Sequence, residues 1–373
     1  MERFARGPWS DGEILDALRG RAGTREIAFR ADILRGGIKV REVGLAPGGS
    51  VTLDMEAGIG RTARIALYAP VNELTEEIRP YMLLRMGGAG VSPQYAAFAL
   101  GVFIPSTPVR RSENGVNTWS IEAYDRTVVL AEDGLDKPLY LAAGTKYLDA
   151  VQGVLTGAGV QNVIIGDYVE TALPADREFD VGTAKLAVIN TLLSEVNFAP
   201  AYCNAEGAFV LSAYRAPSAA SPSFTYRADA LSAIGRDTQT ETDYYGLPNV
   251  FVGVCSNPDL QADYRAAYVN GNEESPFSTV RRGRRIISEI YRPEQIASQA
   301  DLEAYVKRKA FERTQAAGEA VTFRTALMPT HGRGEDLELR HPDFSGVYRE
   351  TRWTLPLEPG GEMEHVAKKA VVL

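Results

Sequence analysis

The stretch of sequence that decides the fold runs from residue 98 to residue 126 and reads FALGVFIPSTPVRRSENGVNTWSIEAYDR. At its centre, Asn114 and Gly115 are two residues that tolerate the positive φ angles of a type I′ turn. Residues with high strand propensity lie on both sides of this turn. The stretch therefore predicts a β-hairpin that joins strands at 108–111 and 118–124, preceded by a strand over 95–104.

The chain before this hairpin shows the same strand pattern. Apolar and polar residues alternate with a period of two in five short segments separated by glycine-rich turns: 25–33, 38–43, 51–55, 62–68 and 80–86. A short helix over 9–19 precedes them, because Ser10 and Glu13 have the spacing of a capping box. Many short strands at regular spacing are typical of a barrel or a sandwich.

The pattern changes after residue 126. Two segments have helical periodicity, one after Thr145 and one after Thr183, and either threonine can serve as an N-cap. A short strand over 163–165 and a hairpin over 202–211 accompany the helices. These features predict a small α+β unit.

Residues 216–224 have the composition of a linker, and strands return after residue 247. One helix interrupts them, because Ser298 and Asp301 form a capping pair. The prediction is a mainly β protein in three parts. They are an N-terminal β-barrel (1–126), an α+β insert (127–215), and a linker with a C-terminal β-barrel region (216–373).

Composition excludes several classes of protein. The chain has 373 residues, of which 45% are apolar and 24% are charged, as is usual for a globular protein. A net charge of −8 does not match a protein that binds duplex DNA. The two cysteines give neither a disulfide framework nor a cysteine zinc site. Nothing in the sequence predicts a transmembrane helix or a secretory signal.

The histidines are the first candidates for chemistry. All three, His331, His341 and His365, lie in the last 43 residues. His331 and His341, together with Asp336 or Asp343, have the residue types of a metal site or an acid–base site. The other interpretation is two solvated loops around a strand over 335–340.

Further candidates each have a structural explanation. The glycines of 87–90 suit a hairpin tip and those of 157–159 a helix end, since neither has the context of a phosphate loop. The acidic segment 132–136 suits a turn. The others are the carboxylate pairs Asp176/Glu178 and Asp237/Asp243, the arginine cluster 281–285, and the tyrosines Tyr226, Tyr244, Tyr245 and Tyr264. We predict no catalytic, cofactor-binding or metal-binding residue among them.

The order of these segments resembles the tail hub proteins of bacteriophages and related injection systems. The resemblance is carried by the strand at 98–105, the Asn114-Gly115 hairpin, the strand at 119–126, Tyr140, Gly144-Thr145, Leu192-Leu193, the turn at 204–207, Tyr214, and the closing segments 353–357 and 360–363. It extends over nearly the whole chain, and its C-terminal third matches least.

The resemblance implies two tube-like β-barrels per chain and a homotrimer that joins a sixfold tail tube to a threefold tip. It implies partners among the distal tail or tail tube, tape measure, and spike or fibre proteins. DNA would only pass through the lumen, which we expect to be acidic. The expected location is the tail tip of a virion assembled in the host cytoplasm, without stable membrane association, cofactor, or the lytic domain of many family members.

Two other functions remain open at this stage. A glycan-binding module would use the tyrosine-rich stretch 226–264, because aromatic rings stack on sugars. A cell-wall hydrolase would use the segment that holds His331 and His341. Substitution of the relevant side chains, followed by glycan-binding or hydrolysis assays, distinguishes these functions from a structural hub.

Overall fold

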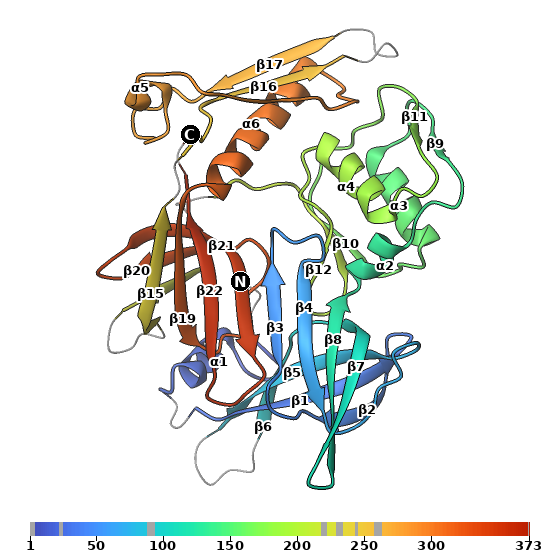
Figure 1. Cartoon of the computed structure of the whole chain (residues 1–373), viewed down its shortest axis with the longest axis vertical. Helices are drawn as coiled ribbons and strands as arrows, with labels where there is room; N and C mark the ends of the chain where they lie inside the picture. The colour runs from blue at the N-terminus through green and yellow to red at the C-terminus, as the bar shows by residue number, and fades with distance from the viewer. Residues whose placement is uncertain are drawn as a thin grey trace.

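The fold is mainly β, with 44% of residues in strands and 17% in helices (Figure 1). The computed structural model describes residues 4–21, 25–87, 94–217, 222–228, 234–242, 245–256, 263–371 and 373. No helix in these ranges is both long and apolar enough to cross a membrane.

One sheet of 14 strands dominates the lower part of the molecule (Figure 1). Along its main path the order is β15, β19, β22, β21, β3, β4, β8, β7, β5, β1, β2, with β6, β14 and β20 paired beside it. The bounds are β1 Ile27–Arg35, β2 Ile38–Gly44, β3 Ser50–Asp54, β4 Arg61–Leu67, β5 Glu77–Met86, β6 Gln94–Ala99, β7 Phe103–Glu113, β8 Val116–Asp125, β14 Phe224–Arg227, β15 Ile234–Thr242, β19 Glu319–Ala326, β20 Asp336–Arg340, β21 Ser345–Pro356 and β22 Glu362–Lys369.

The two ends of the chain meet inside this sheet. Strand β3 pairs antiparallel with β21, and Leu53 lies opposite Trp353. One hydrophobic core therefore contains both N-terminal side chains such as Ile65 and C-terminal side chains such as Phe323. The path of strands is open, and no closed barrel is found among the described residues, so the expectation of two separate barrels is not confirmed.

The hairpin predicted at Asn114-Gly115 is confirmed. Both residues have positive φ, +49° and +81°, and they join β7 to β8. The prediction of one strand over 95–104 is wrong, because Gly101 separates β6 from β7 with φ +147°. A Cβ at Gly101 would lie 2.5 Å from the ring of Phe103, so only glycine fits this corner.

Helix α1 (Asp11–Leu18) confirms the capping box. The Glu13 backbone N–H donates to Ser10 Oγ, and the Ser10 backbone N–H donates to the Glu13 carboxylate. The helix buries Ile14 and Leu18 against the core of the large sheet.

The predicted α+β insert forms around a core of its own. Its elements are α2 Thr127–Glu132, β9 Leu139–Leu141, α3 Tyr147–Gly157, β10 Val163–Ile165, β11 Arg177–Phe179, α4 Lys185–Glu195, β12 Tyr202–Cys203 and β13 Phe209–Leu211. The N-caps were predicted wrongly. They are Lys146 and Ala184, and neither side chain makes a capping hydrogen bond.

A third unit lies at the top of Figure 1, between the insert and the last strands in sequence. It consists of β16 Val250–Cys255, β17 Tyr264–Val269, β18 Ile287–Tyr291, α5 Thr279–Arg282 and α6 Gln299–Ala316. Helix α6 packs closely on the sheet, and a Cβ on Gly253 would lie 2.4 Å from Val306. The boundaries at 126/127 and 215/216 stay a prediction.

Candidate functional site: a buried carboxylate between two histidines

A β-bulge in β21 turns Glu350 into the core. The register between β21 and β22 shifts between Glu350 and Arg352, and residues 348–351 are all buried. Before the bulge, the side chains that face the core are at even-numbered positions, Tyr348 and Glu350. After the bulge, the core-facing side chain is at an odd-numbered position, Trp353. Bulges commonly re-aim a side chain in this way, and they are frequent at functional sites.

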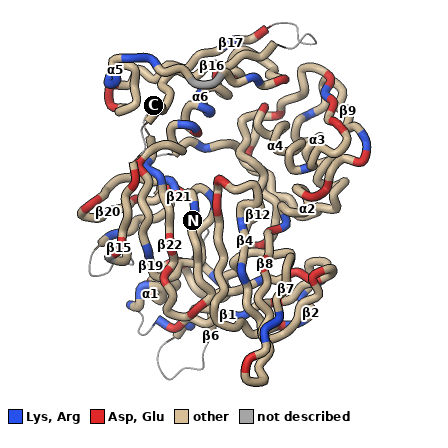
Figure 2. The backbone as a smooth tube through the Cα atoms, in the orientation of Figure 1, with Lys and Arg blue, Asp and Glu red and all other residues tan. Residues whose placement is uncertain are grey.

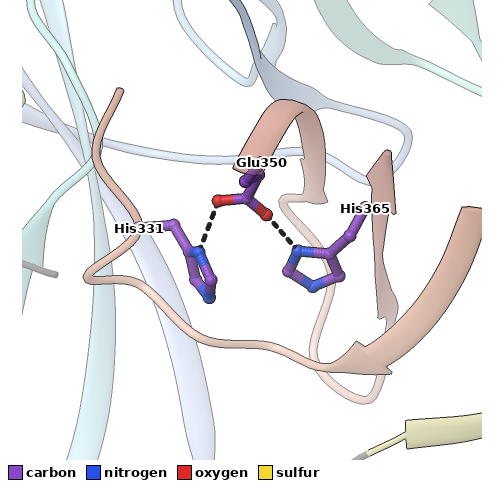
Figure 3. A group of neighbouring side chains, drawn as sticks. All are labelled: His331, Glu350 and His365. Atoms are coloured by element: carbon purple, nitrogen blue, oxygen red, sulfur yellow. Dashed lines mark hydrogen bonds and ion pairs between the residues drawn. The ribbon is translucent and has the colours of Figure 1, made fainter. Parts of the chain in front are cut away.

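The carboxylate of Glu350 lies between two imidazoles (Figure 3). Its Oε2 is 2.6 Å from Nδ1 of His331, which lies in the segment between β19 and β20. Its Oε1 is 2.5 Å from Nδ1 of His365, which lies in β22. The three side chains are at most 2% exposed. Segments 15 and 19 residues away from Glu350 thus bring both imidazoles to one carboxylate.

Two hydroxyl groups hold the far side of the imidazoles. The Tyr226 hydroxyl of β14 lies 2.6 Å from Nε2 of His331, and the Thr325 hydroxyl of β19 lies 2.7 Å from Nε2 of His365. The ring of Phe323 stacks on His365 at a centroid distance of 4.8 Å. Both imidazoles are therefore fixed in orientation by hydrogen bonds at each nitrogen and by aromatic packing.

A second carboxylate, that of Glu335, completes the cluster. Its Oε2 is 3.7 Å from Nδ1 of His331, and its Oε1 accepts a hydrogen bond from the Gly332 backbone N–H. The backbone N–H of Glu350 donates to the backbone oxygen of Glu335, which ties the two residues together. The cluster thus contains two carboxylates and two imidazoles.

The charges in the cluster depend on one another. Burial favours a neutral Glu350, but the charge and hydrogen bonds of His331 and His365 outweigh burial and lower its pKa to about 2. Burial also opposes a charged His331, yet Glu350 and Glu335 raise its pKa. For His365, burial prevails and lowers the pKa. Glu350 is therefore an anion at neutral pH.

Burial limits what this cluster can do. No soluble substrate reaches side chains that are at most 2% exposed. The arrangement can hold a proton or a metal ion, or it can fix the packing of β14, β19, β21 and β22. Among the described residues, His331, Glu350 and His365 form the group whose ligand atoms are close enough for a shared metal ion.

The grouping of His331 with His341 was wrong. The ring of His341 stacks on Phe344 in a turn at a centroid distance of 4.6 Å, and its Nδ1 accepts a hydrogen bond from the Asp343 backbone N–H. Asp336 forms an ion pair with Arg349. Sequence analysis did not include Glu350, which is one charged residue within the β-rich region expected after residue 247.

The three candidate tyrosines that the structure describes do not form one sugar-binding surface. Tyr226 is buried in the core, Tyr264 packs against the core of the upper unit, and Tyr245 is 97% exposed. Tyr244 lies outside the described residues. No stacking platform that spans 226–264 is therefore present in the described part of the chain.

The charged candidates have structural roles. Asp133 forms an ion pair with Lys185, and Asp176 accepts hydrogen bonds from the Tyr140 hydroxyl and the Ala143 backbone. Arg281 donates to the backbone oxygen of Glu273 at the exposed helix α5. Glu178 lies exposed in β11, Asp237 lies exposed in β15, and Asp243 and residues 88–90 lie outside the described residues.

Comparison with known proteins identifies the fold. No protein-family model matches the sequence, and no curated protein matches it. Several solved structures have a similar fold. The tail protein from Neisseria meningitidis MC58 is 12% identical, with a TM-score of 0.65 over 92% of this chain and 97% of that one.

Two prophage proteins are also similar. The 43 kDa tail protein of prophage MuSo2 from Shewanella oneidensis is 11% identical, with a TM-score of 0.58 over 91% of this chain and 98% of that one. The prophage tail protein gp18 from Listeria monocytogenes EGD-e is 10% identical, with a TM-score of 0.58 over 91% and 94%. The resemblance to phage tail proteins is thus confirmed at the level of the fold, which this chain shares with them over nine-tenths of its length.

Proposed function

We propose that the chain is a structural, non-enzymatic hub protein of a bacteriophage tail, and that three copies form a ring with a channel for DNA. The fold shared with phage tail proteins supports the tail assignment. The observation that carries the ring is a pair of open strand edges in the large sheet.

The first open edge belongs to β7. This strand pairs with β8 over its whole length, but its contact with β5 is limited to Phe103 opposite Ile78. The exposed segment 106–113 therefore has no second partner strand among the described residues. It also contains Pro108, and within sheets proline is confined to edges and bulges.

The second open edge belongs to β15, which pairs with β19 along one side in the described part of the chain. Strands β15, β19, β22, β21, β3, β4, β8 and β7 run side by side between the two edges (Figure 1). The unpaired backbone N–H and C=O groups of an edge strand can pair with a strand of another chain. Pairing of β7 in one copy with β15 in the next is a head-to-tail contact, and such contacts form a closed ring when the rotation between copies closes and an open filament when it does not.

The solvent face of these strands would line the channel. It carries ion pairs of both signs, such as Arg64–Glu122 and Arg324–Glu364, and Figure 2 shows both charges along β19, β22 and β21. We therefore propose a lumen lined by paired charges in place of the acidic lumen expected from the sequence. The arginines in these pairs are bound to carboxylates, which reduces their attraction for DNA phosphates.

In this role the trimer would occupy the tail tip of the virion. Its partners would be the distal tail or tail tube protein, the tape measure protein, and tip, spike or fibre proteins, with assembly in the host cytoplasm. The resemblance to tail hub proteins implies two similar β units per chain, which in a threefold ring would offer six comparable positions to a sixfold tube.

Light scattering over a concentration series tests the ring. We expect about 122 kDa, three times the 40.6 kDa of one chain. The variant Val109→Glu places a charge beside the open edge of β7 and should shift the mass toward the monomer. Its control is Val40→Glu on β2, where the side chain is similarly exposed, 47% against 48%, but lies outside the proposed contact.

The ring is contradicted if the chain stays monomeric at every concentration, or if Val40→Glu dissociates the oligomer and Val109→Glu does not. The first result would leave only a trimer templated by tail partners. The second would place the contact at β2, the strand that ends the path beyond β7, β5 and β1.

A further inference from the structure

The buried cluster around Glu350 has the donor atoms of a metal centre. Its two imidazole Nδ1 atoms and the Glu350 carboxylate lie within 4.8 Å of one another, and Glu335 Oε2 lies 3.7 Å from His331 Nδ1. Two imidazoles with carboxylates suit Zn²⁺ and related divalent ions. We propose that this cluster is a structural site for one divalent transition-metal ion of the Zn²⁺ type, acquired as the chain folds.

The surroundings of the two imidazoles support this assignment. A histidine that binds a metal through one ring nitrogen usually donates the other N–H to an oxygen, which fixes the ring and its tautomer. Tyr226 and Thr325 offer hydroxyl oxygens to the two Nε2 atoms at 2.6 and 2.7 Å. Both Nδ1 atoms are thereby left to face Glu350, the position that a metal ligand requires.

The charge of the cluster points the same way. Glu350 and Glu335 bring two carboxylates into a core that also contains Phe323, Trp353 and Met363. Burial of carboxylates is costly unless a positive charge compensates them. Imidazoles that bind a metal are neutral, so a divalent ion would balance both carboxylates.

The present distances show what metal binding would change. The Nδ1-to-oxygen contacts of 2.5 and 2.6 Å have hydrogen-bond length. Ligands at about 2.0–2.1 Å from a tetrahedral ion lie roughly 3.3 Å apart. The Glu350 carboxylate would therefore withdraw by about 0.7 Å, a movement that its rotatable side-chain bonds allow. The two imidazole nitrogens that face it, now up to 4.8 Å apart, would also approach each other to about 3.3 Å.

Metal analysis of the full-length protein tests the site. The chain is unfolded, refolded with Zn²⁺ or Co²⁺, and freed of loosely bound ions, because a buried site fills during folding. We expect one ion per chain, a d–d absorption band with Co²⁺, and a lower Tm after chelation during refolding. Thr325→Val should weaken the affinity about 10–100-fold, because it removes the hydroxyl partner of His365 Nε2.

Glu350→Gln should abolish binding, whereas Glu195→Gln, which changes a buried carboxylate of the insert, should bind as the wild type does. If Glu350→Gln does not fold, the metal content and the Co²⁺ spectrum of the wild type still decide. The proposal is overturned if the refolded wild type contains no metal, shows no band, and has the same Tm with and without Zn²⁺. The cluster would then be a hydrogen-bond network alone.

Discussion

Two buried carboxylates in two regions of the molecule have opposite charge behaviour. In the large sheet, the pKa of Glu350 is lowered to about 2 despite complete burial. In the insert, burial raises the pKa of Glu195 to about 7, although Arg177 and the Tyr147 hydroxyl both oppose that shift. Burial is similar at the two sites, so the partners must explain the difference.

The partners differ in distance and in chemical kind. Glu350 has an imidazole at each oxygen, at 2.5 and 2.6 Å. Glu195 has a hydroxyl at 3.1 Å and the Arg177 guanidinium at 3.6 Å. Arg177 also contacts Glu294 of the upper unit at 2.6 Å. Glu350 of the sheet therefore stays charged. Glu195 of the insert shares the Arg177 cation with Glu294 and titrates near neutral pH.

The largest effect on the free energy of unfolding is expected from a substitution of Glu350 in the large sheet. Glu350→Ala leaves two buried imidazoles without their anion, and loss of one partner of a buried ion pair costs about 3–5 kcal/mol. Urea unfolding at pH 7 should show this loss in the free energy of unfolding. A loss below about 1 kcal/mol would mean that the cluster contributes no more than a surface pair.

The pH dependence of the insert is the next largest effect. The pKa of Glu195 is higher in the folded chain than its usual 4.5, so the folded state binds the extra proton. Its stabilisation is complete below pH 4.5 and is lost as pH rises to about 7, a change of about 3 kcal/mol.

Hydrogen exchange of α3 and α4 across this pH range measures that change. Protection should fall as pH rises in the wild type, after correction for intrinsic exchange rates, and should stay level in Glu195→Gln. Equal pH dependence in both proteins would remove Glu195 as its source and would erase the contrast with Glu350.

The smallest expected effect distinguishes the contribution of the Tyr147 hydroxyl to the pKa of Glu195 from that of Arg177. Tyr147→Phe removes the donor to Glu195 Oε2, and a hydrogen bond to a charged group is worth about 1.5–3 kcal/mol. Because the lost bond favoured the carboxylate anion, the pKa of Glu195 should rise further. NMR titration of the Glu195 side-chain carbon would show the shift, and a lower pKa would contradict this account.

The sequence predicted two features with local causes correctly, although the equally local N-cap predictions at Thr145 and Thr183 were wrong. The Asn114-Gly115 turn and the Ser10–Glu13 capping box follow from residues within a few positions of one another. Their outcome depends on backbone preferences that every occurrence of the motif shares. They therefore appear in the structure as predicted.

Features that depend on distant segments were not predictable from the sequence. The pairing of β3 with β21 joins residues about 300 positions apart, as the hydrogen bond between the Thr52 and Thr354 hydroxyls shows. The bulge at Glu350 depends on the partner strand β22, and the meeting of His331 with His365 depends on that bulge. Composition and periodicity contain no signal for either.

The central claim is that open edges of the large sheet build a ring. Electron cryo-microscopy of the purified oligomer tests it most directly. This account predicts three copies in which segment 106–113 of β7 lies beside β15 of the next copy. A ring joined through β2, or an assembly that leaves β7 and β15 exposed to solvent, would contradict it.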